Sequence, residues 1–257
     1  QVVTDIDDTV KSSGNRRLGG IPLGGIDSQY AYGEFYPGVF QFGLELARHR
    51  LPPWESPLPM AVLTARAREF LFALELNDRH PVSVGYTSCG ARNGVPGWGL
   101  GTVLYGSVKE WVCQERKGWR KFNNFCELVR QDNRSGRFGL RCGYLFIGDT
   151  GEGDTEAAER MCMEHPGRLR AVFLHAVSDR QGPARPLVPQ DRLVAGVPIL
   201  YFRTYVGAAT KAVEHGLMDR GGLQRVSRAA KQALADTPRD SSKWHDLLAD
   251  LKAARRL

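Results

Sequence analysis

The sequence has no apolar run long enough to cross a bilayer. A membrane-spanning helix needs about 20 consecutive apolar residues, whereas the apolar runs at residues 144–147 and 199–202 have the length of strands. We therefore expect no transmembrane segment. The chain begins at Gln1 rather than Met and shows no basic-then-apolar leader, so any targeting segment would be missing from it.

The cysteine and histidine patterns that are typical of disulfide-bonded or metal-binding proteins are also missing. The five cysteines are odd in number and never spaced as C-x-x-C, so neither a disulfide framework nor a thiolate zinc site is indicated. The six histidines are scattered, without a local metal-ligand spacing. We expect a protein of the reducing cytoplasm.

The 257 residues contain no internal repeat, and their 42% hydrophobic and 25% charged residues are typical of a globular protein. The net charge of +7 favours anionic partners. Residues 109–141 hold nine basic against four acidic side chains, and residues 203–257 hold eleven against six. The basic excess is thus confined to two segments.

Apolar β-branched runs alternate with stretches of helical spacing, which indicates a mainly parallel sheet with helical crossovers. The predicted strands are residues 2–5, 60–64, 82–86, 143–148, 169–177 and 198–204, and the predicted helices between them are residues 39–49, 66–78, 121–130 and 156–164. Ligands of such α/β proteins bind at the carboxyl ends of the strands. His175 would lie on this edge, where we interpret it as a structural histidine.

Glycine-rich stretches suggest two irregular segments, a flap or cap insert at about residues 10–36 and a loop at about residues 87–108. Residues 1–205 would form the catalytic domain, and residues 206–257 a helical C-terminal extension packed on it. There, residues 223–235 are predicted to be helical. A final amphipathic helix follows Pro238, and its apolar face would pack on the domain or contact a membrane surface or a partner.

Three carboxylates directly follow the first predicted strand, in the string Asp-Ile-Asp-Asp-Thr at residues 5–9. Side chains two apart on extended backbone point the same way, so Asp5 and Asp7 can share one site, where their repulsion calls for a divalent cation such as Mg²⁺. Asp5 suits nucleophilic attack on phosphorus, and Asp7 suits acid–base work. An acidic turn that merely closes a strand is the structural alternative.

A second acidic string, Gly-Asp-Thr-Gly-Glu-Gly-Asp at residues 148–154, follows another apolar strand. Asp149 and Asp154 are candidate metal ligands, because the glycines allow the backbone to approach an ion closely. The structural alternative is a helix entry in which Asp154 or Thr155 caps the following helix, and such capping is compatible with metal binding.

Together these strings resemble the signatures of haloacid-dehalogenase (HAD) superfamily phosphatases. Residues 5–9 match the D-x-D-x-T motif, and residues 148–154 match the acidic last motif. Between them, Thr64 ends an apolar strand like the second motif, and Lys121 resembles the third-motif lysine, with Lys117 as the alternative. The resemblance implies a HAD-like Rossmannoid three-layer sandwich, with Thr9, Thr64 and Lys121 at the phosphoryl group and Asp5, Asp7, Asp149 and Asp154 at the metal.

The longer strings DIDDTVK at residues 5–11 and GDTGEGDTE at residues 148–156 resemble the actin-patch type of phosphatidate phosphatase catalytic domain over roughly residues 1–180. That likeness implies Mg²⁺-dependent hydrolysis of phosphatidic acid, an anionic lipid that would suit the basic excess. The second motif departs from the family, because it reads Leu-Thr-Ala-Arg instead of a serine-rich version. The insert after the first strand and the tail from Phe202 have no counterpart there.

Two alternatives stay open, a phosphatase for a soluble ester and a lipid-binding or scaffold module without turnover. The paired carboxylates Asp5 and Asp7 disfavour the second, since a pure binder has no need of repelling acids. Nucleic-acid binding is disfavoured because the basic segments show no regular interleaving of aromatic residues that would form a platform for base stacking.

Overall fold

The computed structural model describes residues 1–18, 21–22, 25–52, 54–67, 76–106, 117–135, 143–151, 153–178 and 187–257. Within these ranges the main sheet has seven strands in the order β5-β4-β1-β6-β7-β9-β8. They are β1 (Val2–Thr4), β4 (Met60–Ala67), β5 (Leu100–Gly106), β6 (Tyr144–Asp149), β7 (Leu169–His175), β8 (Arg192–Val194) and β9 (Val197–Phe202). All neighbours are parallel except β8 and β9. A separate hairpin joins β2 (Arg17–Leu18) to β3 (Ile21–Pro22).

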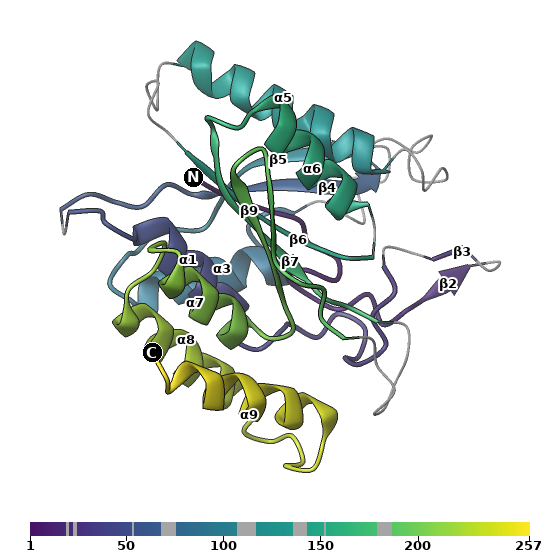
Figure 1. The fold of residues 1–257 in the computed structure, drawn as a ribbon, viewed down its shortest axis with the longest axis vertical. Coiled ribbons are helices and arrows are strands. Elements are labelled where there is room, and N and C mark those ends of the chain that lie inside the picture. The colour runs from purple at the N-terminus through teal and green to yellow at the C-terminus, as the bar shows by residue number, and fades with distance from the viewer. Residues whose placement is uncertain are drawn as a thin grey trace.

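Helices cover both faces of the sheet (Figure 1). One face carries α5 (Lys117–Ser135) and α6 (Asp154–Glu164), the other carries α1 (Val39–Arg48), α3 (Pro81–Arg92) and α7 (Tyr205–Glu214), and α8 (Arg220–Ala233) and α9 (Ser242–Ala254) lie outside α1 and α7. Successive strand residues face opposite layers, as Val2 and Val3 show by belonging to different apolar clusters. The predicted α/β class is confirmed as a three-layer sandwich with a mainly parallel sheet.

The order of the strands reverses between β1 and β6. From β1 the chain continues to β4 and β5 on one side, then returns to β6 and proceeds through β7 to β9 on the other. Ligands of open α/β sheets bind at such a reversal, outside the carboxyl ends of the strands. Asp5 directly follows β1, and Asp149 ends β6. The topology therefore places both acidic strings at the favoured position.

Two predictions in the middle of the chain are wrong. Residues 82–86 are not a strand but part of α3, which begins at Pro81 and buries Val82, Tyr86 and Cys89. These three residues are spaced as one helical face, a signal that outweighs their β-branched neighbours. The glycine-rich segment 87–108 is not one loop, because it contains the end of α3 and strand β5.

The other strand and helix predictions in the described ranges are confirmed with shifted ends. The helix predicted at residues 66–78 lies largely outside the described residues, and residues 66–67 belong to β4. Besides the β2–β3 hairpin and β5, two further elements were not predicted: α7, which Thr204 caps through Gly207 N, and β8, which is followed by a turn at Ala195 and Gly196, both with positive φ. Ala-Gly is not one of the dipeptides that favour a two-residue hairpin turn, so the local sequence offers little signal for β8.

The C-terminal helices pack on the α1 and α7 layer. Trp244 and Leu247 of α9 are buried in the same apolar cluster as Val2 of β1. Arg225 of α8 binds the buried Glu45 of α1, with 2.7 Å between Nε and Oε1. None of the helices in the described part of the chain is long and apolar enough to span a membrane.

Candidate active site at the carboxyl edge of the sheet

Asp5 and Lys121 meet in the interior, although 116 positions separate them in the sequence. Asp5 leaves β1 with its amide bound to Ile147 O of β6, and its carboxylate lies 2.9 Å from Lys121 Nζ. Lys121 projects from α5 and is fully buried. It also forms an ion pair with Asp154 at the start of α6. Lys117, the alternative motif lysine, begins α5, and its side chain is outside the described set.

Three carboxylates surround this lysine. Asp5, Asp149 and Asp154 are buried, and each places an oxygen within 4.8 Å of the others. Asp154 Oδ2 also accepts the Asp149 amide at 3.0 Å, which fixes the turn between β6 and α6. If all four groups are ionised, their net charge is −2, so the interior must hold protons or a cation there. Hard oxygen ligands with this charge fit Mg²⁺.

The carboxyl pKa values reflect the same imbalance. Burial raises the pKa of Asp5 to about 8, with the Asp154 and Asp7 carboxylates adding to it and Lys121 opposing it. Burial, followed by repulsion from Asp154, raises the pKa of Asp149 well above its usual value. Strong perturbation of neighbouring carboxyls is typical of metal and catalytic sites.

The remaining predicted residues lie at the same edge. Asp7 is half-buried and forms an isolated bridge with Lys11, but its carboxylate is not one of the three that cluster. Thr9 is buried, and its hydroxyl has no hydrogen-bond partner among the described residues. Thr64 is buried in β4, two residues past Val62, which pairs with Thr4 of β1. Thr64 therefore lies inside β4, which continues to Ala67 rather than ending at Thr64 as predicted, while Asp5 and Asp149 lie at the ends of β1 and β6.

Asp8 has a structural role that the sequence analysis did not identify. It is buried with φ +57°, in the left-handed region that Asp tolerates better than most residues. Its carboxylate accepts the amides of Ser13, Ile26 and Asp27 at 2.8, 2.6 and 2.9 Å. Burial raises its pKa to about 7, although the Ser13 and Asp27 amides lower it. Asp8 therefore ties the insert after β1 to residues 5–9, which we call the acidic loop.

A glycine in the insert is required by this contact. Gly25 has φ +149°, and a Cβ there would lie 2.1 Å from Asp8 Oδ2. Any side chain at this position would displace the carboxylate from the amides of the insert. The glycine content of residues 10–36 thus has, at this position, a steric cause.

Two aromatic side chains hold carbonyl groups of the acidic loop. Tyr205 OH, at the start of α7, donates to Thr9 O at 2.6 Å. His175 Nδ1 lies 2.8 Å from Asp8 O, and its Nε2 lies 3.1 Å from Arg203 O. Burial lowers the pKa of His175, although its contacts with the Asp8 and Arg203 carbonyls raise it. His175 is a structural histidine, as interpreted from the sequence, and Tyr205 joins the C-terminal region to the same loop.

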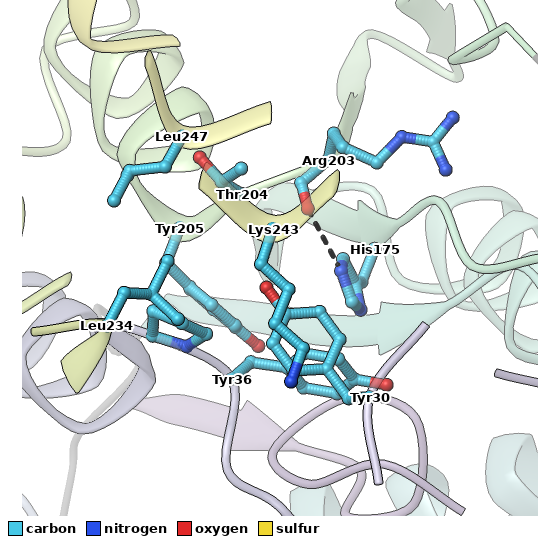
Figure 2. Close-up of a pocket in the computed structure, with 10 residues that line it drawn as sticks. Tyr30, Tyr36, His175, Arg203, Thr204, Tyr205, Leu234, Lys243 and Leu247 are labelled. Carbon is cyan, nitrogen blue, oxygen red and sulfur yellow. Dashed lines mark hydrogen bonds between the residues drawn. The ribbon is translucent and has the colours of Figure 1, made fainter. Parts of the chain in front are cut away.

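A small cavity lies behind this loop (Figure 2). Its volume is about 10 Å³, enough for about one water molecule. The insert contributes Tyr30 and Tyr36, the strand ends contribute His175 and Arg203, and Lys243 of α9 reaches over it. None of the clustered carboxylates lines it. The cavity belongs to the supporting side of the loop and is too small for a substrate.

Comparison of the chain with models of protein families, with curated proteins and with solved structures gave no match.

Proposed function

We propose that this protein is a Mg²⁺-dependent phosphomonoesterase of the HAD type. The observation that carries the proposal is the position of Lys121, whose ammonium contacts Asp5 and Asp154 beside Asp149. Four residues from three separate segments thus form a buried cluster of three acids and one cation, at the carboxyl edge where α/β sheets bind ligands. A purely structural role would not need three carboxylates with so little compensation.

In the proposed reaction, Asp5 attacks phosphorus, and the bond to the ester oxygen breaks as the aspartyl phosphate forms. Asp7 gives its proton to the departing alkoxide. In the second step Asp7 takes a proton from water, which attacks phosphorus and releases phosphate and the free Asp5 carboxylate. The half-buried position of Asp7 suits this exchange with the leaving group and with water, whereas Asp5 is enclosed.

The other residues hold the charges of the reaction. Lys121 lowers the pKa of Asp5 against the effect of burial, and it would neutralise part of the phosphoryl charge. Thr9 and Thr64 supply hydroxyl donors to the phosphoryl oxygens. Mg²⁺, held by Asp5, Asp149 and Asp154, would supply positive charge for an anionic substrate next to three acids.

Phosphatidic acid is the proposed substrate. The support is the likeness of residues 5–11 and 148–156 to phosphatidate phosphatase motifs, together with the basic net charge of +7. The products would be diacylglycerol and inorganic phosphate. A soluble phosphate ester would need the same catalytic residues, so the substrate must be decided by assay.

The test is Mg²⁺-dependent phosphate release from phosphatidic acid in mixed micelles, with para-nitrophenyl phosphate and soluble sugar phosphates alongside. We expect lipid to be preferred, Asp5→Asn to lose turnover, and Asp7→Asn to lose about 10²- to 10⁴-fold. The matched control is Asp78→Asn, which removes an exposed carboxylate before α3. Acid-quenched wild type should carry phosphate on Asp5.

Each other outcome contradicts a defined part of the proposal. Hydrolysis of soluble esters alone would refute the lipid substrate and keep the reaction. Turnover that survives Asp5→Asn would refute the nucleophile. Absence of turnover on every ester with Mg²⁺ present would favour a binding module.

A further inference from the structure

A basic groove lies between α8 and α9. These two helices lie on the outer side of α1 and α7 (Figure 1). The volume of the groove is about 590 Å³. Five cationic side chains line it: Arg220, Arg228, Lys231, Arg239 and Arg255. None of the residues described as lining it is acidic. We call this surface the α8–α9 groove.

The positive charge of the groove is not compensated from within the fold. Of the groove cations, none forms an ion pair with a described residue, whereas Arg225 of the same helix binds Glu45 of α1. The acidic residues of α9 are used elsewhere, because Asp246 accepts from Gln29 and Asp250 accepts from Thr204. The acids of α9 thus bind within the protein, and the five groove cations have no such acidic partner among the described residues.

The floor between these cations is apolar. Leu248 is 51% exposed, and Leu251 and Leu257 are half-buried beside it. Trp244 is only 2% exposed and lies under Arg239, whose guanidinium is 3.8 Å from the ring centroid. A single-stranded nucleic acid typically stacks its bases on exposed aromatic rings. The described lining offers exposed leucine instead, which suits the boundary between lipid headgroups and acyl chains.

The cations are also spread over a distance that fits a surface better than a compact ligand. Arg220 and Lys231 lie eleven residues apart on α8, which corresponds to about 16 Å along a helix axis. Arg255 adds positive charge from the end of α9. Phospholipid headgroups present negative charge over such an area, and apolar side chains among cations add insertion energy.

We propose that the α8–α9 groove is the surface by which this protein docks on anionic lipid membranes. The inference deepens the proposed function, because it rests on a lipid substrate for its purpose, but docking itself requires no turnover. The start of α9 contacts the insert after β1 through Lys243 and Glu34, 2.6 Å apart. Docking would therefore place that insert, which Asp8 holds against the acidic loop, near the bilayer surface.

The test is co-sedimentation of the whole chain with vesicles of phosphatidylcholine, with and without phosphatidylserine. Phosphatidylserine carries no phosphomonoester, so binding to it reports docking rather than substrate recognition. We expect binding only when phosphatidylserine is present, and weaker binding at high salt. The groove variant combines Arg228→Gln, Lys231→Gln and Arg255→Gln.

Each cation near an anionic surface contributes about five-fold in affinity, so the groove variant should bind about 100-fold more weakly. The matched control combines Arg130→Gln, Arg134→Gln and Arg170→Gln, which removes the same charge from exposed positions outside the groove. It should bind close to wild type. A second variant, Leu248→Asn, keeps every charge and should also weaken binding.

Several outcomes would overturn the inference. Equal loss in the groove and control variants would show that net charge alone causes binding. Lack of binding to phosphatidylserine vesicles, or tighter binding to an acidic helical peptide or an oligonucleotide, would reject the membrane as partner. Dimerisation that the groove variant abolishes would assign the surface to a second copy of the chain. Turnover of para-nitrophenyl phosphate should be equal in all variants, so a failure of docking is distinguishable from a failure of the proposed reaction.

Discussion

Divalent cations should stabilise this fold, and more strongly at pH 8 than at pH 6. The pKa of the Asp5 carboxyl is raised from 3.8 to about 8 by burial. As the pH rises from about 4 to about 8, the unfolded chain has lost this proton while the folded protein still retains it. The free energy of unfolding of the metal-free protein therefore falls over this range, and a cation bound to the carboxylates restores it.

The size of the effect follows from mass action. At a Mg²⁺ concentration of about 100 times its dissociation constant at pH 8, binding adds about 2.7 kcal/mol. A chain of this size gains about 2–4 °C in Tm for each kcal/mol, so the expected gain is about 5–11 °C. At pH 6 the ionised fraction of Asp5 is about 50-fold smaller, and the same concentration adds about 0.6 kcal/mol, or about 1–3 °C.

The assay is thermal denaturation with EDTA or Mg²⁺ at both pH values, for the wild type, Asp149→Asn and the exposed control Asp78→Asn. Asp149 is a member of the buried cluster, so its variant should lose most of the Mg²⁺ effect, while the control should keep it. An equal Tm gain at the two pH values, or an undiminished gain in Asp149→Asn, would refute the assignment of this cluster as the metal site.

Three substitutions probe the contacts around the site. Lys121→Met should cost about 3–5 kcal/mol in urea unfolding at pH 8, because it leaves buried carboxylates without their cation. Tyr205→Phe removes the donor to Thr9 O, so it should cost about 1–3 kcal/mol and lower kcat with little change in KM. Gly148→Ala places a Cβ 2.6 Å from Asp154 Oδ2, so it should weaken Mg²⁺ affinity by about 10- to 100-fold in a calorimetric titration.

Matched controls separate these effects from general damage. Tyr32→Phe changes a tyrosine that is 53% exposed, and Gly167→Ala adds a Cβ with nothing within 4 Å. Both should change stability by no more than about 0.5 kcal/mol. A Lys121→Met protein as stable as wild type, or a Gly148→Ala protein with normal Mg²⁺ affinity, would contradict the packing on which the site depends.

Local pattern was sufficient for the fold class. The apolar strings that became β1, β6, β7 and β9 are short and β-branched or aromatic, and they alternate with stretches of helical spacing. Prediction failed where the two periodicities compete. Residues 82–86 carry β-branched side chains, but helical spacing and a proline at the first turn prevailed in α3. Strand β5 is rich in glycine, and its pairing with β4 supplies what its own propensity lacks.

For the candidate site, the sequence alone determined which side chains could do the chemistry. One acidic string follows the first strand, a second acidic string follows a later strand, and a lysine and hydroxyl side chains lie between them in the sequence. Such motifs can be found from sequence because they are local and the backbone fixes their spacing. The sequence could not show that Asp8 would hold the insert, or that Tyr205 would reach Thr9 across 196 positions.

Only the tertiary structure decided how these residues meet. The strand order places β1 beside β6, and the packing of α5 on that sheet carries Lys121 into the acidic cluster. Likewise, the sequence indicated an amphipathic C-terminal helix within a basic segment. The packing of α8 against α9 decided which cations of this segment share one groove. The physical reason is that long-range burial, rather than local propensity, determines which distant side chains lie together, and their shared desolvation then determines their charge.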